Sequence, residues 1–362
     1  MGIAPSPSCT VHPATSIARR TGDDMGANAG DGEGWPNALA KYEALASSLP
    51  SRKGLGSALY RRHGGFWYPE HLMAPTLAAR GSFVARPSDV ILATIPKSGT
   101  TWLKALSFSV VHRGRHAPGS PGHPLLGSSP HDLVPFLHST YESRSAAVAP
   151  VDLLEAMPSP SPRILAVHTP LSSLPASVRE SGCRVVYLCR DPKDAFVSLR
   201  HYLDEIKPEG STMTPFAEAF ELLCDGVSPF GPMWEHAAEY WKESLARPEQ
   251  VMFLRYESLK EDGAGSVRTL AGFLGRPFTD DEVARGVPEA IVELCSMQRM
   301  RSVEANRDGK HGAATSWSFK NSAFFRKGEV GDWKEHMTEA MAQRLDGVVK
   351  EKLRGTGLSL SH

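Results

Sequence analysis

One short segment combines side chains and backbone groups that can hold a phosphate group. It reads ILATIPKSGTTWLKAL, residues 91–106, and places Lys97, Ser98, Gly99, Thr100 and Thr101 between an apolar run and a predicted helix. Glycine lets the backbone approach a ligand, and the unpaired N–H groups of a helix that begins near Trp102 attract anions. A Walker A loop has the pattern GxxxxGK[ST], whereas this lysine precedes the only glycine. We therefore predict a P-loop-like anion site that is not a standard ATP-binding loop; the alternative is a strand-to-helix turn with a solvated lysine.

A second set of anion-binding residues begins at Arg190, which directly follows an apolar run. Asp191 and Pro192 predict a helix N-cap followed by proline at the first helical position, and Asp194 is placed as in a capping box. Ser198 then lies two helical turns into the predicted helix. An arginine at a strand end and a serine on the adjoining helix suit a second phosphate. Taken singly, each is more often a surface ion pair or a helix-lining hydroxyl.

A third basic group lies near the C-terminus. The segment FFRKGEVGDWK places Arg326 and Lys327 directly before Gly328. A loop interrupted by glycines can surround an anion with donors from both side chains and backbone. We expect this loop to be a further candidate anion site.

His168 is a candidate general base. A neutral imidazole, with an ordinary pKa of about 6.5, can take a proton from a hydroxyl near neutral pH. A lone histidine is more often a surface or packing residue, so this role depends on its surroundings. No HExxH pattern or Cys/His cluster indicates a metal, and His112 and His116 straddle Gly114 at the start of a predicted loop.

Four β-rich runs precede these residues and alternate with helical patterns, which predicts a parallel sheet covered by helices. In an open α/β sheet the ligand crevice lies outside the carboxyl ends of the strands. We therefore predict one cleft that contains Lys97, His168, Arg190 and Tyr256. The runs are Asp89–Ile95, Arg163–Val167, Arg184–Cys189 and Val251–Arg255.

Composition limits the class of protein. The 362 residues include 40 basic and 40 acidic side chains, so an anion site must be local and a nucleic-acid partner is not expected. The five cysteines are widely spaced without a CxxC pair, which favours a reducing, intracellular compartment. No run of eighteen apolar residues exists, so no membrane-spanning segment is predicted.

Two regions lack apolar periodicity. Residues 1–45 are predicted to be a disordered tail, although Gly2 and Ser6 fit a myristoylation pattern and a transit peptide is a further alternative. Residues 46–362 are predicted to form a single domain. Within it, residues 114–161 are rich in proline and serine, and a loop of this length is a candidate lid.

Three ordered motifs, IPKSGTTW, YLCRDPKDAFVS and RKGEVGDWK, resemble the signatures of the soluble cytosolic sulfotransferases. GFWYPEHLMAPTL, HTPLSSLP, GVSPFGPMWEH and FLRYESLKED match family segments in the same order, and the resemblance covers residues 60–355. The insertion before HTPLSSLP and the sequence of the segment GVSPFGP are most similar to those of plant members of the family. The resemblance implies an α/β, P-loop-like fold with a central parallel sheet flanked by helices. It also implies transfer of a sulfuryl group from 3′-phosphoadenosine-5′-phosphosulfate (PAPS) to an acceptor hydroxyl.

The same resemblance implies residue roles. Lys97 would steady charge on the leaving phosphate, and His168 would be the general base. The 5′-phosphosulfate would be held by Lys97, Ser98, Gly99, Thr100, Thr101 and Trp102, and the 3′-phosphate by Arg190, Ser198, Arg326, Lys327 and Gly328. Tyr256 and Trp102 would contact the adenine, and Met297 stands where many members place a phenylalanine.

Some family features are not matched. Animal members commonly carry a lysine two residues before the histidine, whereas Ala166 stands here, so that charge is not implied. The animal-type C-terminal dimer motif is not evident, so the oligomeric state stays open. Sulfuryl carries less negative charge than phosphoryl, so a lysine aimed at the bridging oxygen is expected to suffice without a metal.

Three functions therefore remain at this point. The leading one is a cytoplasmic sulfotransferase that acts on a small apolar hydroxylated metabolite, of flavonoid, phenolic, steroid, hydroxylated hormone or strigolactone type. The alternatives are a nucleotide-dependent kinase of a small molecule and a non-catalytic protein that binds adenosine bisphosphate. The absence of a Walker A sequence makes the kinase interpretation weaker.

Overall fold

The computed structural model describes residues 35–142, 150, 154, 162–312 and 318–361. At its centre is a four-stranded parallel sheet with the order β5-β4-β6-β7. The strands are β4 (Val90–Thr94), β5 (Ile164–Val167), β6 (Arg184–Cys189) and β7 (Val251–Arg255). The parallel sheet predicted from the four runs is confirmed, and two runs are shorter than predicted at their ends.

Both faces of this sheet are buried, and successive side chains alternate between two apolar clusters. In β4, Ile91 and Ala93 belong to one cluster, while Val90 and Leu92 belong to the other. In β5, Leu165 belongs to the first of these clusters and Ile164 to the second. Two-sided burial explains why these strands read as continuous apolar runs rather than as an apolar–polar alternation.

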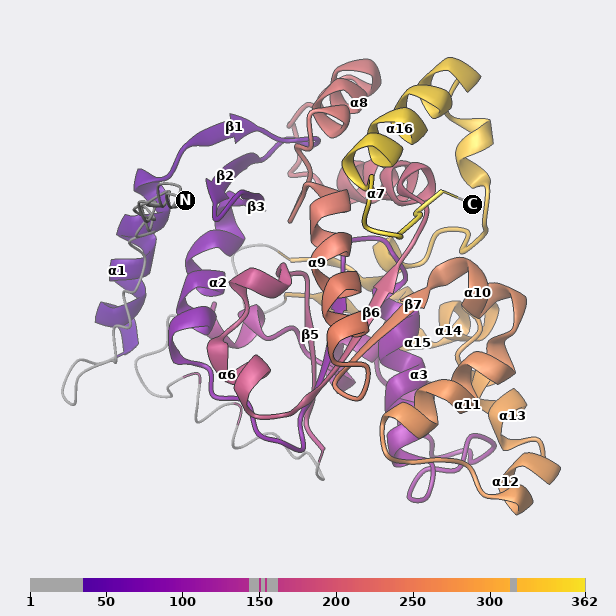
Figure 1. Cartoon of the computed structure of the whole chain (residues 1–362). Helices are drawn as coiled ribbons and strands as arrows, with labels where there is room; N and C mark the ends of the chain where they lie inside the picture. The colour runs from indigo at the N-terminus through magenta and orange to yellow at the C-terminus, as the bar shows by residue number, and fades with distance from the viewer. Residues whose placement is uncertain (1–34, 143–149, 151–153, 155–161, 313–317, 362) are drawn as a thin grey trace, which may run out of the picture.

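Helices cover the two faces, as Figure 1 shows for the central strands between their flanking helices. The cluster of one face includes residues of α2 (Glu70–Ser82), α6 (Ala176–Glu180), α7 (Pro192–Ile206), α8 (Phe216–Cys224), α9 (Met233–Ala246) and α16 (Glu339–Lys352). The cluster of the other includes α3 (Thr100–His112), α10 (Tyr256–Glu261), α11 (Gly263–Phe273), α13 (Val287–Leu294) and α14 (Met297–Ser302). Within the described ranges, none of the helices is both long and apolar enough to cross a bilayer.

The N-terminal part of the described chain corrects one prediction. The predicted disordered tail is wrong for its last residues, because α1 spans Trp35–Ser48 and packs on α2 (indigo in Figure 1) through the buried side chains of Leu39 and Ala46. The segment is rich in the helix formers Ala, Leu, Lys and Glu. Residues 1–34, with the myristoylation and transit-peptide alternatives, lie outside the described residues.

A three-stranded antiparallel sheet, which the sequence analysis did not predict, follows α1. Its strands are β1 (Ser51–Lys53), β2 (Leu59–His63) and β3 (Phe66–Pro69). Phe66 and Tyr68 of β3 pack with α1 and α2 in a third apolar cluster. The sheet therefore attaches α1 to the rest of the molecule.

Short elements make up the remainder. In the proline- and serine-rich region, the described residues form η1 (Pro124–Leu126), α4 (Pro130–Leu133) and η2 (His138–Tyr141). The lid function predicted there stays a prediction, since most of residues 143–161 lie outside the described ranges. The other elements are η3 (Leu171–Ser173), α12 (Asp280–Ala284), α15 (Glu304–Arg307), β8 (Lys310–His311), β9 (Phe319–Lys320), η4 (Asn321–Phe324) and η5 (Asp332–Glu335).

A buried ion pair joins the N-terminal ends of two central strands and leads to a stability prediction. Arg163 donates through Nε at 2.9 Å and Nη2 at 2.6 Å to the two carboxylate oxygens of Asp89. Replacing Asp89 by Asn should lower the free energy of unfolding by about 3–5 kcal/mol, because the buried guanidinium loses its charged partner. Urea unfolding measures this loss.

The exposed pair Arg285–Asp281 provides the matched control. Asp281→Asn should change stability much less, because solvent already screens that pair. Equal losses in the two variants would contradict the importance of the buried pair.

Candidate active site

A cavity of about 1680 Å³ opens beyond the carboxyl ends of the central strands. Lys97, His168, Arg190 and Tyr256, which follow the four strands, all line it, so the predicted common cleft is confirmed. Most other predicted site residues line it as well, namely Gly99, Thr100, Thr101, Trp102, Ser198, Met297, Arg326 and Gly328. Ser98, which is buried, and Lys327 are not among the lining residues.

The loop after β4 is held in an unusual backbone conformation. Lys97 has a φ of 70°, which is uncommon for a residue with a side chain, and Gly99 has a φ of 105°. A Cβ atom at Gly99 would lie 2.8 Å from Cδ2 of Tyr256, so only glycine fits there. The loop turns directly into α3, and Thr100, its first residue, lines the cavity. Unpaired N–H groups of this helix start therefore lie at the cavity.

Lys97 is poised between its neutral and charged forms. Its Nζ lies 4.4 Å from the ring centre of Tyr202. Burial, followed by the nearby charges of Arg190 and Arg326, lowers the pKa of Lys97 to about 7. An anion bound at this loop would offset both effects by favouring the ammonium form.

His168 presents one ring nitrogen to the cavity. Its Nδ1 lies 2.8 Å from the carbonyl oxygen of Thr94, which can only accept, so Nδ1 carries the proton. Nε2 is left as an acceptor, because the hydrogen bonds that the ring makes with the described residues all involve Nδ1. Burial lowers the pKa of His168 to about 3, so the ring is neutral. Nε2 of His236 lies 3.0 Å from the carbonyl oxygen of His168 and holds the backbone in place.

Two arginines converge on the cavity from different segments. Arg190 donates through Nη2 to the carbonyl oxygen of Glu329 at 2.5 Å, and Arg326 pairs with Asp332. The Nε atoms of both arginines are buried and lack an acceptor in the described part of the chain. Buried donors of this kind are unfavourable unless a ligand accepts from them, so the pair fits a phosphate group.

Asp194 corrects a second prediction. The capping box is wrong, because Asp191 alone caps α7 through its side chain and its backbone N–H donates to Glu257. Asp194 instead accepts from the N–H groups of Gly331 at 2.8 Å and Trp333 at 3.0 Å. It therefore ties the helix that follows Arg190 to the glycine-rich loop that carries Arg326.

Aromatic and thioether side chains form the wall next to these loops. The rings of Trp102 and Tyr256 meet edge to face with their centres 5.5 Å apart. The hydroxyl of Tyr256 donates to the carbonyl oxygen of Gly328 at 2.8 Å. Gly328 has a φ of 70°, and a Cβ atom there would lie 2.7 Å from Cε of Met297. Trp102, Tyr256 and Met297 therefore line the same part of the cavity, which suits a flat heterocycle.

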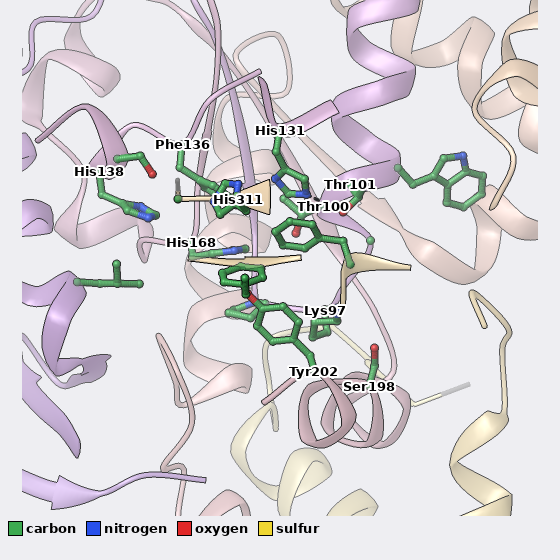
Figure 2. A pocket seen from close by; sticks show the side chains of 18 of the residues that line it. Lys97, Thr100, Thr101, His131, Phe136, His138, His168, Ser198, Tyr202 and His311 are labelled. Carbon is green, nitrogen blue, oxygen red and sulfur yellow. Dashed lines mark hydrogen bonds between the residues drawn. The ribbon is translucent and has the colours of Figure 1, made fainter. Parts of the chain in front are cut away.

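The cavity is also lined by rings that sequence analysis did not single out. Figure 2 shows His131, His138 and His311 around the same space as His168 and Tyr202. His131 stacks on Phe324 with ring centres 3.9 Å apart. These residues come from the proline- and serine-rich region and from short elements near β8, where no periodic pattern marks them. In the sequence, the high content of His and Phe in these regions was the feature that could have indicated the additional rings.

Other clustered histidines and carboxylates are explained by packing. His112, His116 and His123 surround the ring of Phe108, with ring centres 4.7 to 6.4 Å from it. Asp332, Glu335 and His336 gather their ligand atoms within 4.8 Å of one another. Asp332 already pairs with Arg326 and Lys327, so its charge is compensated.

In comparisons with known proteins, the matching family model, two plant relatives and a solved structure are all sulfotransferases. A family model described as the sulfotransferase domain matches residues 87–357. Cytosolic sulfotransferase 15 of Arabidopsis thaliana is 42% identical over 321 residues, covering 88% of this chain and 87% of that protein. The flavonol 3-sulfotransferase of Flaveria bidentis is 39% identical, covering 81% and 91%. A mouse sulfotransferase structure complexed with PAP aligns with a TM-score of 0.61 at 28% identity, covering 82% of this chain and 94% of that chain.

The lowered pKa of Lys97 predicts that an anionic nucleotide binds with proton uptake above pH 7. The ammonium form is already present below the free pKa of about 7, but above it the bound anion must draw a proton onto the lysine. Affinity should therefore fall as the pH rises above 7. Calorimetry with 3′,5′-bisphosphoadenosine near pH 8, in two buffers of different ionisation enthalpy, measures the proton taken up.

Two variants serve as controls for this measurement. Lys97→Met should abolish the buffer dependence, while Lys53→Met, at an exposed lysine paired with Glu218, should retain it. Identical binding heats in both buffers for the unmodified protein would contradict the assignment.

Proposed function

The chain belongs to the sulfotransferase family, and on that premise we propose that it transfers a sulfuryl group from PAPS to a hydroxyl of a small aromatic metabolite. Membership sets aside the kinase and the non-catalytic binding protein. The observation that carries the proposal is that Lys97 and the free Nε2 of His168 line one cavity together with the helix start at Thr100. We further propose a cytosolic location, as in the names of its Arabidopsis relatives.

The residues present fit the donor. The loop of Lys97, Gly99, Thr100, Thr101 and Trp102 would hold the 5′-phosphosulfate, with Ser98 contributing backbone. Arg190, Ser198, Arg326, Lys327 and Gly328 would hold the 3′-phosphate, and the buried, unpartnered Nε atoms of both arginines support this placement. Trp102, Tyr256 and Met297 would contact the adenine. When bound, the donor supplies an activated sulfuryl group for in-line displacement.

Two residues of the chain would then do the chemistry. Lys97, once charged by the nearby anion, would stabilise negative charge that develops on the leaving phosphate. His168 would hold the acceptor hydroxyl at Nε2 and take its proton, with Nδ1 anchored to Thr94 in the correct tautomer. Positioning and charge stabilisation suffice for this transfer in principle, so a bound metal is not part of the proposal.

The acceptor class follows from the rings beyond His168. Phe136, which lines the cavity, and Phe230, which lies behind the lining, flank the His168 ring with centres 4.7 and 5.5 Å away. Further rings that line the cavity include His131, His138, His311, Tyr202 and Phe324. Flat aromatic acceptors can stack on such walls. Among the flavonoid, phenolic, steroid, hormone and strigolactone types, we therefore favour flavonoids and other phenols. The flavonol 3-sulfotransferase relative supports this choice.

A panel of acceptors tests this proposal. With labelled PAPS, flavonols and simple phenols should be sulfated faster than saturated steroid alcohols, and His168→Ala should lower the rate about 10²–10⁴-fold because the general base is lost. Binding of 3′,5′-bisphosphoadenosine should be nearly unchanged in His168→Ala, which separates catalysis from folding. A preference for steroid alcohols would overturn the acceptor class, and near wild-type turnover in the variant would place the base elsewhere.

The proposed 3′-phosphate site predicts a ligand-dependent effect of Arg190→Ala. A hydrogen bond to a charged group contributes about 1.5–3 kcal/mol, so the variant should bind 3′,5′-bisphosphoadenosine about 10- to 100-fold more weakly. Adenosine-5′-phosphosulfate lacks the 3′-phosphate, so its affinity should barely change. Calorimetry compares the two ligands. Equal weakening would mean that Arg190 supports the fold or the 5′ site instead.

A further inference from the structure

Lys104 occupies a position that a lysine rarely takes. It lies in α3 with none of its surface exposed, and its Nζ is 3.0 Å from Nδ1 of His131 and 3.6 Å from the ring centre of Phe136. In the described part of the chain, no carboxylate lies within ion-pair distance. Burial lowers the pKa of Lys104 well below its ordinary value. Burying this amine is unfavourable for stability, which points to a functional reason for keeping it.

His131 continues the contacts from Lys104 to the cavity. Its Nε2 is 3.0 Å from Oγ1 of Thr101, and both residues line the cavity. Burial, with the charge of Lys104, lowers the pKa of His131 well below its ordinary value. The ring is therefore neutral and has one N–H group and one acceptor nitrogen. Stacking on Phe324 fixes the ring plane.

The direction of these hydrogen bonds depends on the form of Lys104. An ammonium group can only donate, so in that form its N–H bonds would point to the ring face of Phe136 and to Nδ1 of His131, whereas a neutral amine could either donate to Nδ1 or accept from it. If Nδ1 accepts, Nε2 must carry the proton and donate to Oγ1 of Thr101. The hydroxyl hydrogen of Thr101 is then free to turn toward the cavity.

We propose that Lys104 and His131 are positioning residues that fix the Thr101 hydroxyl as a hydrogen-bond donor toward the anion in the Lys97 loop. This inference rests on the proposed function, because it takes the phosphosulfate to bind at that loop. Thr100 is connected to a different histidine, since its Oγ1 is 2.6 Å from Oγ1 of Thr94, which lies 3.2 Å from Nδ1 of His168. The two threonines of the loop therefore contact different histidines, Thr101 directly and Thr100 through Thr94.

Affinity for 3′,5′-bisphosphoadenosine tests the chain of contacts. Thr101→Val removes the hydroxyl and should weaken binding about tenfold, as expected for one hydrogen bond to a charged group. Lys104→Met and His131→Phe should weaken binding to a similar extent. His131→Gln is the matched control, because its amide can accept from Lys104 and donate to Thr101, and it should retain most of the affinity.

Double variants separate this role from the simple charge of a lysine. If Lys104 acts through Thr101, then Lys104→Met should cause no further loss when Thr101→Val is already present. A loss that persists in the Thr101→Val background would mean a direct electrostatic effect and would overturn the inference. Thermal unfolding provides a second readout: Lys104→Met should keep or raise the melting temperature while affinity falls. A lower melting temperature with unchanged affinity would show a purely structural lysine.

The tautomer of His131 gives a readout that is independent of affinity. In ¹⁵N-histidine-labelled protein, the signals lost in His131→Gln should correspond to a ring protonated at Nε2, and a proton at Nδ1 would overturn the inference. The affinity measurements distinguish failure of the proposed function from failure of this inference. If Thr101→Val leaves affinity unchanged, the proposed 5′ site is wrong at this residue; if it weakens binding while Lys104→Met and His131→Phe do not, only the positioning role fails.

Discussion

A parallel sheet buried on both faces leaves only the ends of its strands for polar chemistry. Alternate residues of β4 enter the two apolar clusters, so a charged side chain within the strand would lose its solvation without gaining a partner. The polar residues that follow Thr94, Val167 and Cys189 therefore meet at one edge. Residues nearly one hundred positions apart in the chain share a cavity because the strands that precede them are neighbours.

Burial also sets the protonation of the groups that gather there. The pKa of Lys97 is lowered to about 7 and that of His168 to about 3, in both cases mainly by burial. The contacts that favour the charged forms, Glu205 for Lys97 and the Thr94 carbonyl for His168, do not offset burial. An anionic ligand in the Lys97 loop would supply the missing counter-charge and would favour the ammonium form of Lys97. Burial keeps the ring of His168 neutral but also weakens it as a base, so the same bound anion would be needed to raise its affinity for a proton.

The strand ends were predictable from sequence because buried parallel strands leave long apolar runs, and the first residue after each run is visible in the sequence. The antiparallel sheet and α1 were not predictable, since the three residues of β1 are all exposed and α1 has a weak amphipathic pattern. Asp194 has the spacing of a capping box, but its carboxylate instead accepts hydrogen bonds from the backbone N–H groups of Gly331 and Trp333, which lie far away in the sequence. His131 was missed because its partners, Lys104 and Thr101, are contacts that only the fold creates.

Tyr256 couples the loops that surround the proposed donor site. Its ring lies so close to Gly99 that no side chain fits there, and its hydroxyl donates to the carbonyl oxygen of Gly328. The guanidinium of Arg190 lies 4.5 Å from the centre of the same ring. One side chain at the start of α10 thus contacts the Lys97 loop, the Arg190 strand end and the glycine-rich loop. Because these contacts are made within the chain itself, they hold the three parts of the proposed donor site in one arrangement, which lowers the ordering cost of binding a nucleotide.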